Sequence, residues 1–139
     1  MIKEVQILLS GMHIGPEKEK IVQRHKGEYY KKNANHYILY EEAEDEVSTK
    51  TKNVIKLTEH GMELTRRGTV NVHMLFEEAK TFQTVYQTPF GPIMLGIETK
   101  KIEITEQDGS IRVLAIYDRE IDGEHQADCR IELEVKDRA

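Results

Sequence analysis

The chain of 139 residues has the length of one globular domain, and we predict a single domain spanning residues 1–139. Its 25 acidic and 20 basic residues give a net charge of -5, which excludes the basic surface typical of nucleic-acid binding. Its one cysteine, Cys129, excludes an internal disulfide, and no apolar run approaches the length of about 20 residues that a membrane helix needs. No signal peptide is recognisable, so we expect a cytoplasmic protein without nucleic-acid or membrane partners.

Alternating apolar and polar residues predict β-strands along most of the chain, because successive side chains of a strand point to opposite faces of a sheet. In chain order, the predicted strands are 2–9, 20–30, 36–42, 52–58, 61–67, 69–76, 81–88, 93–105, 110–118 and 125–136. Turn sequences such as Asp108-Gly109 and Asp122-Gly123 separate neighbouring strands and favour hairpins. The one helical candidate, 16–20, is short and falls in a predicted loop.

The last predicted strand shows the alternation most clearly. Its inward face carries only apolar residues and the cysteine, namely Ala127, Cys129, Ile131, Leu133 and Val135. Charged residues occupy the opposite face, which predicts a strand with one buried side and one side in water. The strand 110–118 differs, because apolar residues occupy both of its faces and predict cover on both sides.

Two prolines interrupt the strand pattern near residue 90. Pro89 cannot donate a hydrogen bond to a neighbouring strand, so we predict that one strand ends there. Phe90 and Gly91 are predicted to form the turn, and Pro92 to start the return strand.

The return strand contains a second irregularity. Ile93, Leu95, Ile97 and Thr99 share one face, but Ile102 and Ile104 continue the apolar pattern at even positions. One extra residue accounts for this change, so we predict a β-bulge between Thr99 and Ile102. A bulge bends a strand sharply, as a sheet must bend when it closes on itself. The simpler alternative is a surface turn followed by a strand that ends at Thr99.

Short strands joined by hairpins form an antiparallel sheet with two exposed edges, which are liable to pair with other chains. Closing the sheet removes both edges, and about eight strands make a barrel wide enough for side chains or one small ligand. We therefore predict an all-β fold, a single closed or nearly closed antiparallel meander barrel of about eight strands, in which the first and last strands meet.

Four segments carry a resemblance to a known family: Gly27–Asp45, Leu64–Glu78, Tyr86–Ile104 and Ile111–Glu124. The most specific part is the arrangement of Tyr86, Thr88, Gly91 and Thr99. In these segments the chain resembles the YwiB-like family of uncharacterised bacterial proteins, a domain-of-unknown-function family of calycin (lipocalin-like) β-barrels. The resemblance implies a meandering barrel of about eight strands, and it implies no established activity or functional residues.

Arg66 is the main candidate for interior chemistry. It shares a strand face with Met62 and Leu64, so we expect it to point inward, where an unpaired charge is costly. Glu41 or Glu42 is the predicted partner. Such a pair, with the hydroxyls of Tyr40, Tyr86, Thr88, Thr99 and Tyr117, could bind a small anionic or amphipathic ligand. Alternatively, the pair is a structural plug at one end of the barrel.

Other reactive residue types give weaker signals. The carboxylate run 41–46 lacks the turn glycine of a calcium loop, and the six histidines lack zinc-binding spacing. Cys129 faces the core, and we interpret Asp118, Arg119 and Glu120 as solvated charges. We therefore predict no catalytic residues, no metal site and no cofactor.

Two functions remain open. The first is binding of a small molecule inside the barrel, which requires a cavity of a few hundred Å³. The second is a protein-interaction or assembly module with a packed barrel, in which Tyr29, Tyr30, Tyr37 and Phe90 anchor an interface. A homo-oligomer is compatible with either function, whereas an enzyme is not indicated.

Overall fold

The computed structural model describes residues 3–14, 20–44, 49–68 and 71–137, excluding the side chains of 12–14, 43–44, 49 and 86–88. Antiparallel strands make up nearly all of this part of the chain. They are β1 (Lys3–Ile14), β2 (Lys20–Lys32), β3 (Asn35–Glu44), β4 (Thr49–Leu57), β5 (Gly61–Arg67), β6 (Val72–Glu77), β7 (Thr81–Thr88), β8 (Gly91–Gln107), β9 (Ser110–Ile121) and β10 (Glu124–Asp137). The helical candidate 16–20 lies almost entirely outside the described residues, and the described residues contain no helix long and apolar enough to cross a membrane.

All ten strands belong to one sheet in the order β6-β5-β4-β3-β2-β1-β10-β9-β8-β7. The first and last strands meet as predicted, because β1 pairs with β10 from Val5 opposite Asp137 onward. The sheet edges are instead β6 and β7, which follow one another in the sequence but are not hydrogen-bonded to each other. The prediction of a nearly closed antiparallel barrel is confirmed, with ten strands in place of about eight.

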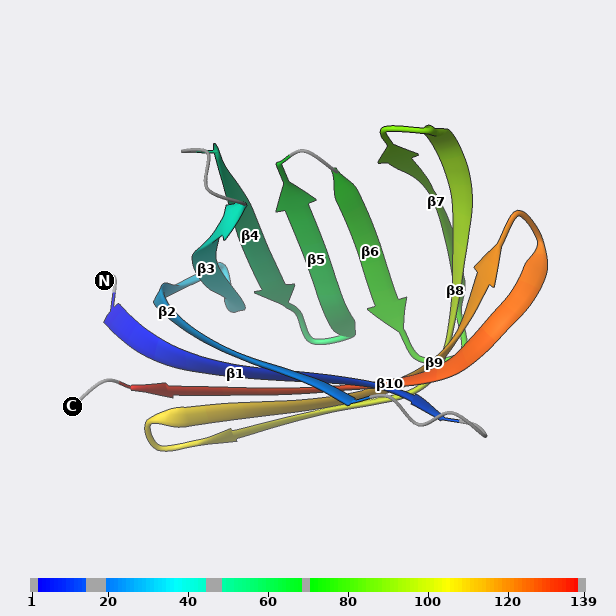
Figure 1. Ribbon diagram of the computed structural model, residues 1–139. Helices are drawn as coiled ribbons and strands as arrows, with labels where there is room; N and C mark the ends of the chain where they lie inside the picture. The colour runs from blue at the N-terminus through cyan, green and yellow to red at the C-terminus, as the bar shows by residue number, and fades with distance from the viewer. Residues whose placement is uncertain (1–2, 15–19, 45–48, 69–70, 138–139) are drawn as a thin grey trace.

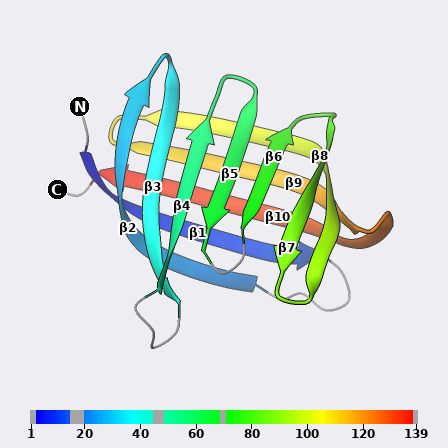
Figure 2. The same ribbon diagram turned by 90° about the horizontal axis from the view of Figure 1, so that it is seen from above.

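The barrel is flattened into two layers whose strands cross (Figures 1 and 2). β1, β10 and β9 lie in one layer, and β4, β5 and β6 lie in the other (Figure 1). β2 and β8 run from one layer into the other, so these two strands form the corners of the barrel (Figures 1 and 2).

A glycine lies at the corner in β2. This strand pairs with β1 as far as Tyr29 and with β3 from Glu28 onward, so Gly27 stands next to the change of partner. A Cβ atom at Gly27 would collide with the carbonyl oxygen of Leu39 and lie 2.7 Å from Cδ1 of Ile7. Glycine is therefore required here by the close approach of neighbouring strands.

The corner in β8 is the predicted bulge. Thr99 pairs with Tyr117 and Lys101 pairs with Ile116, so Lys100 is the extra residue. The bulge also holds the connection between β6 and β7: Ala79 N donates to the carbonyl oxygen of Thr99 (2.9 Å), and Thr99 N donates to that of Lys80 (3.1 Å). The turn before β8 lies one residue earlier than predicted, because Gly91 already pairs with Thr88.

One half of the barrel interior is tightly packed. Phe76 and Met62 are fully buried there, and Phe76 meets the ring of Tyr117 edge-to-face at 4.9 Å between centroids. We call this region the packed half and define it by its buried inward side chains, which are Val5, Ile7, Ile38, Leu57, Met62, Phe76, Val113, Ala115, Leu133 and Val135.

A polar clamp lies beside the packed half. The buried His36 contacts Oε1 of Glu106 through Nε2 and the hydroxyl of Tyr29 through Nδ1, both at 2.6 Å. Glu106 belongs to β8, whereas His36 belongs to β3, and these strands are not neighbours in the sheet. The clamp therefore joins two parts of the barrel wall that backbone hydrogen bonds do not connect.

Candidate functional site

The other half of the interior contains a cavity of about 450 Å³. Its apolar wall includes aliphatic side chains from six strands, namely Leu9, Leu64, Met74, Ile97, Ile121 and Ile131. Ile21 and Arg66 also line it, and Ile21 is 54% exposed while the Arg66 side chain is 44% exposed. These two residues therefore lie where the cavity opens to solvent. We call this region the hollow half.

A glycine contributes to the space in the hollow half. Gly11 lines the cavity and continues the inward face of β1 that Val5, Ile7 and Leu9 begin. A Cβ atom at Gly11 would have no heavy atom within 4 Å. The missing side chain is thus one local reason why this part of the barrel is not filled.

Glu42 is the centre of a polar cluster on one wall. Its Oε2 lies 3.2 Å from Nη2 of Arg66, and its Oε1 accepts a hydrogen bond from Nδ2 of Asn53 at 3.5 Å. Nε2 of His25 lies 3.8 Å from the same Oε1, and the ring of His25 stacks on Tyr40 with centroids 4.5 Å apart. The Glu42 side chain is only 17% exposed, so Arg66 compensates a largely buried charge.

Tyr40 adds a protonated hydroxyl to this wall. Burial raises the pKa of Tyr40 to about 12, and the Glu42 carboxylate adds to the rise while Arg66 opposes it. At neutral pH the phenol therefore keeps its proton and remains a hydrogen-bond donor.

A second polar group comes from β9. Tyr117 and Arg119 both line the cavity, and burial raises the pKa of Tyr117, which keeps it neutral. Arg119 makes no ion pair within the described part of the chain, and its buried Nε has no hydrogen-bond partner. Arg119 therefore has at least one hydrogen-bond donor, Nε, that the described residues do not use.

Four of the predicted site residues line the cavity: Tyr40, Glu42, Arg66 and Tyr117. Of the two predicted partners of Arg66, Glu42 forms the pair. Glu41 lies on the opposite face of β3 beside Lys50 at 3.7 Å, so it is not a cavity residue, because neighbouring strand residues point to opposite faces. Thr99 is buried at the bulge and is not among the lining residues. The side chains of Tyr86 and Thr88 lie outside the described residues.

The interpretation of Arg119 as a solvated charge is wrong. Arg119 follows Tyr117 by two residues and therefore shares its inward face. The alternation of β9 could have revealed this position, but the charged neighbours Asp118 and Glu120 favoured a solvent-exposed strand end.

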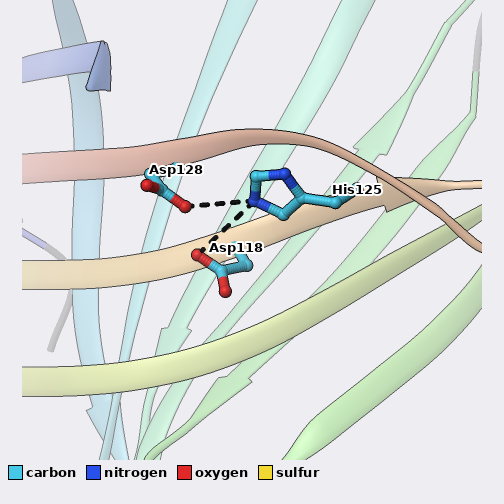
Figure 3. Close-up of side chains that lie close together, drawn as sticks. All are labelled: Asp118, His125 and Asp128. Atoms are coloured by element: carbon cyan, nitrogen blue, oxygen red, sulfur yellow. Dashed lines mark hydrogen bonds and ion pairs between the residues drawn. The ribbon is translucent and has the colours of Figure 1, made fainter. Parts of the chain in front are cut away.

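Asp118, His125 and Asp128 form a separate cluster at the β9–β10 hairpin (Figure 3). Asp118 and Asp128 stand directly opposite each other, an arrangement that is unfavourable for two like charges. His125 Nε2 lies 3.1 Å from Asp128 Oδ1 and 4.0 Å from Asp118 Oδ1, and Lys100 Nζ lies 3.2 Å from Asp118 Oδ2. These ligand types suit a metal ion. Lys100 already places a positive charge beside the Asp118 carboxylate.

The cluster is also separated from the cavity. Asp118 and Asp128 alternate with inward residues of their strands, so they lie on the outer face of the barrel wall. Hydrogen bonding to Asp118 and His125 lowers the pKa of Asp128, which keeps this carboxylate ionised.

The fold and the cavity together define the class of protein. A nearly closed antiparallel barrel with an interior cavity is the architecture of the calycin-like barrels. Within that class, the chain belongs to the family described as "Domain of unknown function (DUF1934)", which matches residues 7–133.

The structural comparison agrees with this assignment. The chain is similar to the crystal structure of the ywiB protein from Bacillus subtilis, with a TM-score of 0.84 and 21% sequence identity. The match covers 99% of this chain and 94% of the other. At this identity the likeness concerns the fold. No curated protein matches the chain.

Proposed function

We propose that the protein binds a small amphipathic molecule inside the barrel. The observation that carries this proposal is the cavity of about 450 Å³ in the hollow half. Ligand sites are usually concave and mostly apolar, with a few polar groups that orient the ligand. The aliphatic wall, the Glu42 cluster and Arg119 have these properties.

The packed-barrel alternative is less well supported, because it requires a filled interior. Its best support is an exposed apolar strip on the β7–β8 hairpin, where Val85 stands opposite Met94 and Phe90 is 99% exposed at the turn. An oligomer formed through this strip would be compatible with ligand binding. We place the protein in the cytoplasm, in keeping with a single buried cysteine.

The proposal can be tested by filling the cavity. Gly11→Leu adds an apolar side chain where a Cβ atom meets nothing within 4 Å, so the variant should fold and exclude the ligand. Native mass spectrometry of protein purified from its own host should show a retained small molecule on the wild type and none on Gly11→Leu.

The matched control is Lys26→Leu, which places the same side chain on the exposed face of β2. This variant should retain the molecule. Equal occupancy of Gly11→Leu and the wild type would show that the cavity is not the binding site, and a wild type without any retained molecule would contradict ligand binding.

A further inference from the structure

We propose that the ligand is a monocarboxylic acid whose carboxylate is bound by Arg119. This inference rests on the proposed function and specifies the chemical class of the ligand. It follows from the charge balance of the cavity, the position of each arginine and the composition of the wall.

The charged side chains that line the cavity are Glu42, Arg66 and Arg119. Glu42 and Arg66 form an ion pair at 3.2 Å and neutralise each other. Arg119 is therefore left with an uncompensated positive charge within the described part of the cavity wall. A partly buried charge without a partner is costly, and one bound anion removes that cost.

Arg66 is less suited to bind the anion. It is already paired, and its exposed position at the cavity opening leaves its charge screened by water. Arg119 has its Nε buried, so its donors are held in a medium of lower dielectric constant. A guanidinium group matches a carboxylate through two parallel hydrogen bonds, and Nε of Arg119, which has no hydrogen-bond partner among the described residues, is one of the donors that can form such a pair.

The charge balance also favours a monoanion. A phosphate monoester carries about -1.5 to -2 charges at neutral pH, so it would leave the cavity with excess negative charge near Glu42. A carboxylate carries a single charge and makes the cavity neutral. Tyr117 lies two residues from Arg119 on the same face and keeps its proton, so it adds no negative charge.

The part of the ligand next to Arg119 meets apolar side chains. The wall around Arg119 includes Leu95, Ile97, Ile121 and Ile131, none of which offers a hydrogen bond from its side chain. Each buried CH₂ group contributes about 0.8 kcal/mol of transfer free energy, so an aliphatic chain gains affinity from this wall. Along these four side chains, a polyhydroxylated acid would lose hydrogen bonds to water without replacing them.

The experiment compares two probes of equal chain length, octanoate and 1-octanol, by isothermal titration calorimetry. Wild-type protein should bind octanoate at least about tenfold more tightly than 1-octanol, because a hydrogen bond to a charged group is stronger than a neutral one. Arg119→Met should lose about tenfold or more of its octanoate affinity and keep its affinity for 1-octanol. Arg119→Lys should retain part of the preference, because it keeps the charge but not the paired donors.

The matched control is Arg112→Met, which removes an exposed arginine from the outer face of the same strand and does not touch the cavity wall. This variant should keep the octanoate preference within about threefold, because the site is distant from the substitution. An unchanged octanoate preference in Arg119→Met, or an equal loss of preference in Arg112→Met, would overturn the inference.

The outcomes separate the two proposals. If the wild type binds both probes equally and Gly11→Leu blocks both, the cavity binds ligands but the carboxylate assignment is wrong. If neither probe binds and no molecule is retained from the host, both proposals fail.

Discussion

The packed half and the hollow half of the barrel are built from the same strands but have different contents. Along β6, Phe76 is fully buried in the packed half, whereas Val72 lines the cavity. Along β3, Ile38 is fully buried in the packed half, whereas Glu42, four residues later on the same face, lines the cavity. The inward face is thus apolar and large in one half, and smaller or polar in the other.

This difference suggests a division of roles between the halves. Buried apolar area is the main source of folding free energy, and the packed half contributes much of it, while Ile55 and Ile97 beside the cavity are also fully buried. The hollow half keeps buried polar groups that cost free energy unless they are paired. The barrel can tolerate them because the same ten strands are already held together by the packed half and by the sheet hydrogen bonds.

The largest effect should come from truncating the packed half. Phe76→Ala removes a fully buried ring and should lower the free energy of unfolding by about 3–5 kcal/mol. Met74→Ala removes a side chain of the same strand that lines the cavity, and should cost about 1 kcal/mol. Urea denaturation followed by circular dichroism measures both. Equal losses would show that the halves do not differ in packing.

Two glycines provide a second comparison. Gly27→Ala should lower the free energy of unfolding by about 1–3 kcal/mol, because the added Cβ overlaps the backbone of β3. Gly11→Ala should raise it by about 0.5–1 kcal/mol, because alanine restricts the unfolded chain and the added Cβ meets open space. The same denaturation experiment applies. Destabilisation by Gly11→Ala would mean that the hollow half is more tightly packed than the structure indicates.

The smallest effect on stability is expected from the ionisation of Tyr40 at high pH. Its pKa is about 12 in the folded protein and 10.0 in the reference state, so its contribution to stability is complete below pH 10 and is lost as the pH rises toward 12. By about pH 11 the free energy of unfolding of the wild type should have fallen by about 1 kcal/mol relative to that of Tyr40→Phe, which cannot ionise at this position. Thermal unfolding of both proteins from pH 8 to pH 11 tests this. Parallel curves for the two proteins would contradict burial of the Tyr40 hydroxyl.

Much of the barrel could be predicted from local patterns. The change of face predicted a bulge between Thr99 and Ile102, because side chains alternate strictly along a strand, and the structure has it at Lys100. The inward positions of Tyr40 and Tyr117 followed from the same alternation. The opening of the barrel between β6 and β7 was not predicted, because two strands that follow one another in the sequence and are joined by a short turn usually pair.

The amino-acid sequence by itself determined the strands, the alternation of side chains along them and the bulge in β8, since these properties depend on neighbours within a few residues. Only the tertiary structure decided that Glu42 rather than Glu41 pairs with Arg66, that Arg119 has no ion-pair partner among the described residues, and that one half of the barrel stays hollow. These properties depend on the volumes and charges of side chains that come together from strands far apart in the sequence. A pattern of neighbouring residues does not show which of these side chains will meet.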